Sequence, residues 1–161
     1  MAKATEGRPE TGRGPSEARQ RLIDALNEDL SREYQAIIAY VVYSQVITGA
    51  PYMAIAKELE VHAGEELAHA LIISKQIDYL GGTPTVSPKP VRMSENTAEL
   101  LRFDLENELV TIREYRKRVG ECEALGEFAI AEHIREILKD EQEHLIDLAT
   151  ALGEPPPDPG A

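Results

Sequence analysis

Residues 138–148, LKDEQEHLIDL, place Glu141 three positions before His144 within a run of helix-forming residues. On an α-helix this spacing puts a carboxylate and an imidazole on one face, one turn apart. The same Glu-x-x-His spacing recurs in EELAHA at residues 65–70. A single copy is a weak signal, because acidic helices produce it by chance, so its interpretation depends on what accompanies the two copies.

The two motifs belong to an internal repeat of the chain. The interval in sequence from Glu33 to Glu66 equals the interval from Glu108 to Glu141. A single shift, the one that carries Glu33 onto Glu108, therefore aligns the first half of the sequence with the second. We interpret the chain as two copies of one helical hairpin. The aligned pairs are Glu33 and Glu108, Tyr40 and Tyr115, Glu66 and Glu141, and His69 and His144.

Four segments with apolar residues at helical spacing predict four helices and no sheet. Gly-Ala-Pro at 49–51 and the glycine pair at 81–82 are typical of helix ends. Pro51 is predicted to lie in the first turn of the second helix. Ser94 is predicted to cap the third helix, with Glu95 in its first turn. The predicted helices run from about Ser16 to Thr48, Pro51 to Leu80, Ser94 to Leu125 and Glu127 to Leu152.

Each predicted helix carries one inward-facing stripe, as in a helical bundle. The stripes are apolar except near their middles, where each contains one of the four repeated glutamates. Toward the helix ends they include Ser44, Gln76 and Val119, and they contain no lysine or arginine. About 15 residues of helix, roughly 22 Å, separate each glutamate from its hairpin turn. The four glutamates are therefore predicted to meet at one level of the bundle.

The segment between the two halves, TPTVSPKPVRM at residues 83–93, is rich in proline and is predicted to be extended. The whole connection of about 13 residues can span roughly 43 Å, enough to cross the length of the bundle. The expected fold is all-α, an antiparallel four-helix bundle with one long crossover between helices two and three. Residues 17–153 form this bundle, between a flexible tail at 1–16 and a loose, Pro-rich tail at 154–161.

The composition is that of an acidic chain without membrane or secretion signals. It has 17 Lys and Arg residues against 29 Asp and Glu residues, for a formal net charge of −12. Such a surface attracts cations and repels phosphates, so neither DNA nor a membrane is an expected partner. No apolar run reaches bilayer length, and no secretory signal opens the chain. Because Cys122 is the only cysteine, a reducing, cytoplasmic location is expected.

Four carboxylates at one level of an apolar core require neutralisation, because a buried unpaired carboxylate is costly. Two divalent cations would balance the four charges. One Glu from each of two helices, with Glu-x-x-His from each of the other two, is the arrangement of di-iron and di-manganese proteins. Carboxylate and imidazole donors without thiolate favour iron, or manganese, over structural zinc. The candidate ligands are Glu33, Glu66, His69, Glu108, Glu141 and His144.

Over about residues 20–150 the sequence resembles the ferritin-like superfamily, in particular bacterioferritins and DPS-like proteins. The segments that carry the resemblance are LNEDLSREYQAIIAY (26–40), EELAHA (65–70), LRFDLENEL (101–109) and LKDEQEHLIDL (138–148). The resemblance implies the six ligands above, with Glu66 and Glu141 as bridging carboxylates and Tyr40 beside the site. It also implies oxidation of Fe(II) by O2 or H2O2, and storage of an Fe(III) mineral inside a hollow shell.

Two departures from the bacterioferritin pattern affect haem binding and assembly. Bacterioferritins bind haem through a methionine directly after the helix-two glutamate, where this chain has Leu67, so no haem is expected. The C-terminal GEPPPDPGA replaces the fifth helix of 24-subunit cages, which favours a dodecamer over a 24-mer or a dimer. Apolar residues outside the core stripes predict an interface between subunits. They are Ile38, Val41, Val42, Tyr43, Leu71 and Ile72.

Two alternative functions share these features. One is a peroxide-scavenging di-manganese or di-iron enzyme of the catalase or rubrerythrin kind, and the other is a DNA-protecting, DPS-like shell. Tyr115 could hydrogen-bond a ligand carboxylate or be an ordinary core tyrosine. His62 could bind a third metal ion, although a core or supporting histidine is the favoured interpretation. His133 and Cys122 are interpreted as structural residues.

Overall fold

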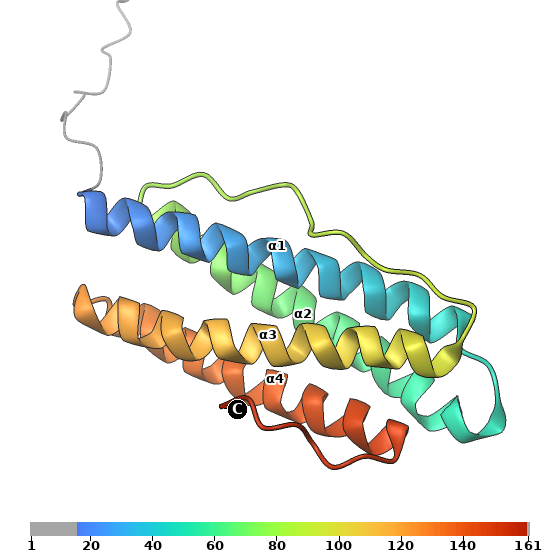
Figure 1. Ribbon diagram of the computed structural model, residues 1–161. Coiled ribbons are helices and arrows are strands. Elements are labelled where there is room, and N and C mark those ends of the chain that lie inside the picture. Colours follow the sequence, from blue (N-terminus) through green and yellow to red (C-terminus); the bar gives the residue numbers. More distant parts are fainter. Residues whose placement is uncertain (1–15, 161) are drawn as a thin grey trace, which may run out of the picture.

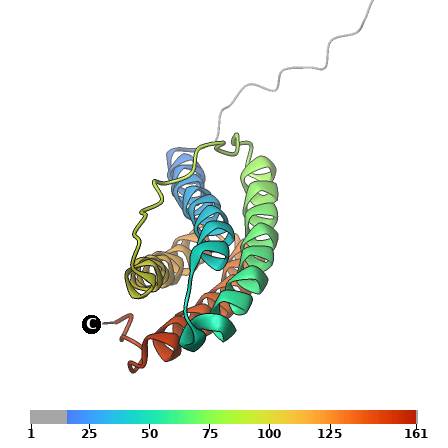
Figure 2. The ribbon, with the colours of Figure 1, turned by 90° about the vertical axis from the view of Figure 1, so that its right-hand side faces the viewer.

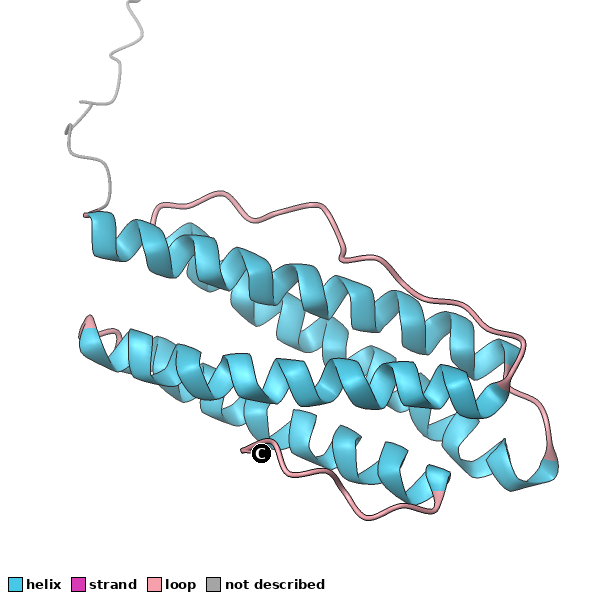
Figure 3. Ribbon diagram, in the orientation of Figure 1, coloured by secondary structure: helices cyan, strands magenta, loops and turns pink. Residues whose placement is uncertain are grey.

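The computed structural model describes residues 16–160, and this part of the chain contains four long helices and no strand (Figure 1; Figure 3). The expected all-α fold class is confirmed. A short 3₁₀ helix precedes the second long helix. The elements are α1 (Glu17–Val46), η1 (Ala50–Tyr52), α2 (Met53–Tyr79), α3 (Thr97–Ala124) and α4 (Phe128–Leu152).

The four helices form two antiparallel hairpins, α1 with α2 and α3 with α4, which pack into one bundle (Figure 2). The crossover from α2 to α3 runs extended along the outside of α1 (Figure 1). Hydrogen bonds from its backbone hold it there. The N–H of Thr85 donates to the side chain of Asn27 at 2.7 Å, and the N–H of Lys89 donates to the carbonyl of Ser31 at 3.0 Å. The expected single long crossover is therefore confirmed.

The start of α3 corrects the expected cap. Asn96, rather than Ser94, caps the helix, because its side chain accepts hydrogen bonds from the N–H groups of Ala98 and Glu99. The Ser94 hydroxyl instead accepts from the N–H of Asn96 at 3.0 Å and donates to the Glu99 carboxylate at 2.6 Å. Ser94 thus shapes the turn before the cap, and the cap lies two residues later than predicted.

The end of the first hairpin also differs from the prediction. α1 ends at Val46, before the expected Thr48. Pro51 lies in η1 and not in the first turn of α2, because the chain leaves Gly49 (φ of +112°) in a 3₁₀ turn before α2 begins at Met53. A positive φ at Gly81 stops the chain from continuing α2, in agreement with the predicted helix end.

The core consists of two apolar clusters, one on each side of a polar layer near the middle of the bundle. All four long helices contribute to both clusters. Along α1, Leu30 belongs to the first cluster and Tyr40 to the second, with the buried Glu33 between them. The apolar burial therefore holds the helices together on both sides of the glutamates.

Two stripe positions near helix ends are corrected. Tyr43 is buried where the stripe predicted Ser44, because its hydroxyl reaches the crossover and donates to the carbonyl of Arg92. Ile77 is buried where the stripe predicted Gln76, since a step of four residues brings the apolar side chain inward. Ser44 and Gln76 are half-buried.

An arginine reaches the core, contrary to the prediction. Arg118 is only 2% exposed, beside the half-buried Val119. Its guanidinium pairs with Asp29, which is fully buried, with Nε 2.7 Å from Oδ2. Arg32 also pairs with Asp29, and Arg118 also pairs with Glu121. Arg118 is therefore held away from the four glutamates and does not neutralise them.

The structure describes the C-terminal tail but not residues 1–15 of the N-terminal tail. Residues 1–15 of the predicted flexible tail lie outside the described residues. The Pro-rich C-terminal tail is non-helical and turns back along the bundle (Figure 1), but it is tied to α3 instead of loose. Glu154 pairs with Arg102 (Oε2–Nη1 3.0 Å), and the carbonyl of Pro159 accepts from Nε of Arg113 at 3.0 Å. Within residues 16–160, no helix is long and apolar enough to cross a membrane.

Candidate metal centre

The structure brings all six candidate ligands together in the polar layer, each no more than 3% exposed. They form two overlapping groups, and within each group one donor atom per residue lies within 4.8 Å of the others. Glu66 and Glu141 belong to both groups. The first group is Glu33, Glu66, His69 and Glu141, and the second is Glu66, Glu108, Glu141 and His144.

The Nδ1 atoms of both histidines point at the shared carboxylates. His69 Nδ1 lies 3.2 Å from Glu66 Oε2 and 3.3 Å from Glu141 Oε1. His144 Nδ1 lies 3.0 Å from Glu66 Oε1 and 3.5 Å from Glu141 Oε2. Donor atoms around one ion with bonds of ~2.1 Å at tetrahedral angles lie about 3.4 Å apart, so these separations suit atoms that share an ion.

Several donor atoms in the layer are buried without a hydrogen-bond partner. Glu66 Oε1 and His144 Nδ1 are both without one, although they are only 3.0 Å apart, because the angles are wrong for a hydrogen bond. The atoms aim at a common point and not at each other. Buried unpaired donors are costly, and divalent cations suit a set of carboxylate oxygens and imidazole nitrogens. The other unpaired ligand atoms are Glu33 Oε2, Glu108 Oε2 and Glu141 Oε1.

The electrostatics divide the four glutamates into two kinds. Burial, with the nearby charges of Glu66 and Glu141, raises the pKa of Glu33 well above its usual range. Burial and the charge of Glu141 do the same to the pKa of Glu108. Burial also opposes ionisation of Glu66 and Glu141, but their close contacts with the two histidines outweigh it and lower both pKa values.

The histidines complete this charge balance. Burial alone would lower the pKa values of His69 and His144, but hydrogen bonds to the glutamates raise both. Metal ligands must be deprotonated, so cations and protons compete for the same carboxylate and imidazole atoms.

A model of the ferritin-like domain matches residues 23–155 of the sequence. The chain belongs to the ferritin-like family. The bacterioferritin of Brucella melitensis is 28% identical over 133 residues, covering 82% of this chain and 83% of that protein. The bacterioferritin of Streptomyces coelicolor is 28% identical over 140 residues, with 83% and 84% coverage. A solved structure described as a ferritin-like, diiron-carboxylate protein from Bacillus anthracis has a TM-score of 0.82 and 32% identity, covering 85% of this chain and 99% of that chain.

Two tyrosines of this ferritin-like protein hold ligand carboxylates across the bundle. Tyr40 in α1 donates to Glu108 in α3, and Tyr115 in α3 donates to Glu33 in α1. Both tyrosines are fully buried. The internal repeat relates these two contacts, because it pairs Tyr40 with Tyr115 and Glu33 with Glu108. Tyr115 thus hydrogen-bonds a candidate ligand carboxylate, which was one of its two interpretations.

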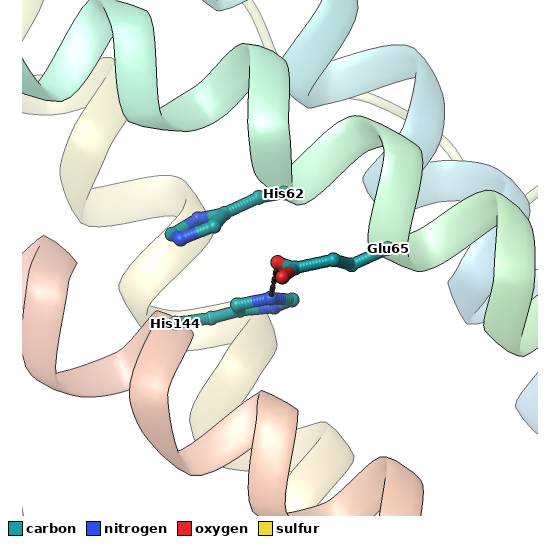
Figure 4. Close-up of side chains that lie close together, drawn as sticks. All are labelled: His62, Glu65 and His144. Atoms are coloured by element: carbon teal, nitrogen blue, oxygen red, sulfur yellow. Dashed lines mark hydrogen bonds and ion pairs between the residues drawn. The ribbon is translucent and has the colours of Figure 1, made fainter.

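Two acidic residues that the sequence analysis missed bind the far nitrogens of the histidines. His69 Nε2 lies 3.1 Å from Asp140 Oδ2. His144 Nε2 lies 2.9 Å from Glu65 Oε2, and Figure 4 draws this second contact. Glu65 and Asp140 are also related by the internal repeat, and each directly precedes a candidate ligand glutamate. Both look like solvent-facing acidic residues in the sequence, and their position beside the motif is the only signal that could have found them.

The far carboxylates fix the ring orientation and leave Nδ1 free for a metal ion. We therefore expect Asp140→Ala to weaken metal binding by about 10–100-fold. Asp140 is about half exposed, at 53%, so the substitution leaves the core packing intact. Competition with a chelator measures the affinity, and Glu143→Ala, at an exposed position of α4, is the matched control. Equal affinities of the two variants would show that Asp140 has no such role.

The centre is closed to solvent in this conformation. A cavity of about 10 Å³ remains beside it, between α1 and α3. That is close to the smallest volume that holds one water molecule. Arg32, Gln35 and Thr111 also line it. The four glutamates are no more than 3% exposed, and such a low-dielectric environment strengthens their attraction for cations.

Proposed function

We propose that this ferritin-like protein is a ferroxidase that oxidises Fe(II) to Fe(III) at a carboxylate-bridged di-iron site, for iron storage and detoxification. The observation that carries the proposal is the overlap of the two donor groups at Glu66 and Glu141. Glu33 and His69 would hold one ion, Glu108 and His144 the other, and the shared glutamates would bridge them. The bacterioferritin relatives and the diiron-carboxylate neighbour support the choice of iron.

The residues around the site suit this chemistry. Four hard carboxylates favour Fe(III) over Fe(II), so binding itself promotes loss of an electron from each ion. Two adjacent ions supply the two electrons that reduce O2 to H2O2, or H2O2 to water. Tyr40 and Tyr115 fix the outer carboxylates, and the closed layer excludes bulk water.

Haem has no part in the proposed function. Leu67, in place of the methionine that binds haem in bacterioferritins, is 53% exposed on α2 and offers no donor atom to a haem iron.

The proposed assembly is a closed cytoplasmic homo-oligomer, with twelve subunits favoured. Exposed Ile38, Val41 and Leu71 on α1 and α2 would be covered between subunits, whereas Tyr43 belongs to the core.

Stopped-flow measurement of Fe(II) oxidation tests the proposal. Anaerobic protein loaded with two Fe(II) ions per chain is mixed with O2 or with H2O2, and Fe(III) absorbance is followed. We expect oxidation faster than in protein-free buffer at the same pH and iron concentration. If the iron is bound but its oxidation is no faster than in buffer, the protein is not a ferroxidase.

A further inference from the structure

A second group of histidine and carboxylate side chains lies between α2 and α4, outside the six-residue centre. His62 is 2% exposed, and its ring stacks on the ring of His144 with centroids 4.0 Å apart (Figure 4). The Nε2 atom of His62 lies 3.2 Å from Asp147 Oδ2 and 3.9 Å from Glu58 Oε1. One donor atom from each of these three residues lies within 4.8 Å of the other two.

Nothing positively charged balances the two carboxylates. Among residues 16–160, neither Glu58 nor Asp147 forms an ion pair with a lysine or an arginine. The second ring nitrogen of His62, Nδ1, is buried without a hydrogen-bond partner.

The internal repeat shows that the bundle does not need a polar residue at position 62. The shift that carries Glu33 onto Glu108 relates His62 to Ile137 and Ile72 to Asp147. Ile137 is buried, so the other half of the bundle fills the equivalent space with an apolar side chain. Burial of a histidine at position 62 is thus a feature of one half alone.

The group is accessible from solvent. An open pocket of about 540 Å³ lies between α2 and α4, and Glu58 and Asp147 line it together with Ala54 and Thr150. A cation could therefore reach the carboxylates without opening the bundle. The imidazole lies behind them, on the side of the six-residue centre.

We propose that His62 Nε2, Asp147 and Glu58 bind one divalent first-row transition-metal ion, at a site distinct from the six-residue centre. Bonds of ~2.1 Å at tetrahedral angles place donor atoms about 3.4 Å apart, and the observed 3.2 and 3.9 Å bracket that value. Water from the pocket completes the coordination. The proposal concerns binding alone and stands whether or not the six-residue centre oxidises iron.

Zn(II), which does not change its oxidation state, is the probe for this site. The full-length protein is titrated with Zn(II) by calorimetry, and the number of ions bound per chain is compared between variants. We expect Asp147→Asn and Glu58→Gln each to bind one ion fewer than the wild type. The control, Glu143→Gln, changes an exposed carboxylate of α4 and should bind as many ions as the wild type. Asp147 and Glu58 are 41% and 49% exposed, so neither substitution endangers folding.

Anomalous scattering at the zinc edge locates the ion. A peak within bonding distance of His62 Nε2 and Asp147 in wild-type crystals, absent from Asp147→Asn crystals, would establish the site. The proposal is overturned if Asp147→Asn binds as many ions as the wild type, or if zinc-soaked crystals show no peak beside His62. Both experiments compare wild type with variants that keep the six-residue centre intact. If that centre bound no zinc, the wild type would still bind one ion more than Asp147→Asn.

Discussion

Replacing Glu141 with alanine is expected to remove both metal ions, not one, and to reduce Fe(II) oxidation to the rate in protein-free buffer. Glu141 belongs to both donor groups, and its oxygens lie 3.3 Å from His69 Nδ1 and 3.5 Å from His144 Nδ1. Without this carboxylate each ion loses a ligand and the charge balance fails. Replacing a residue that only supports a metal ligand weakens metal binding by up to about 100-fold. Because Glu141 is itself a candidate ligand, the loss of affinity should be larger.

Metal analysis of the Glu141→Ala protein after dialysis, together with stopped-flow oxidation, measures the effect. Glu143→Ala is the control, because it removes a carboxylate from the same helix at an exposed position. Circular dichroism verifies that both variants are folded. Retention of two tightly bound ions in Glu141→Ala would contradict the assignment of this residue as a bridge.

Replacing Arg118 with alanine is expected to lower the free energy of unfolding by about 2–3 kcal/mol, because hydrogen bonds to a charged group are lost. The carboxylate of Asp29, at 0% exposure, then keeps only Arg32, which pairs with its Oδ1. For a chain of this size the midpoint of thermal unfolding should fall by roughly 10 °C. Chemical unfolding of metal-free protein gives the free energy without a contribution from bound ions.

Arg116→Ala is the matched control for this prediction, because Arg116 lies two residues earlier on an exposed face of α3. A change within about 0.5 kcal/mol is expected there. The double variant Asp29→Leu/Arg118→Met should recover much of the loss, since it removes both buried charges. A loss below about 1 kcal/mol in Arg118→Ala would mean that water or another group compensates Asp29.

The sequence was sufficient to predict the bundle and the convergence of the six candidate ligands, for a physical reason. Side chains that meet inside a bundle must recur every three or four residues on each helix, and this periodicity is visible without a structure. The identical interval between the two glutamates of each hairpin then placed all four at one level. Neither inference required knowledge of side-chain conformations.

The features that escaped prediction depend on contacts between helices. Arg118 and Asp29 are 89 positions apart, and each alone reads as a solvated surface charge. Glu65 and Asp140 lie beside the inward stripe, and only the direction of the opposite histidine shows that they reach it. The choice of Asn96 over Ser94 as a helix cap depends on the path of the crossover, which the local sequence does not fix.

Anomalous diffraction from crystals grown anaerobically with Fe(II), recorded on both sides of the iron edge, tests the two-ion centre most directly. The expected result is two iron peaks per chain inside the bundle, both within bonding distance of Glu66 and Glu141. One peak should lie beside Nδ1 of His69 and the other beside Nδ1 of His144. A single peak, or no iron between the four glutamates, would contradict a di-iron centre in this protein.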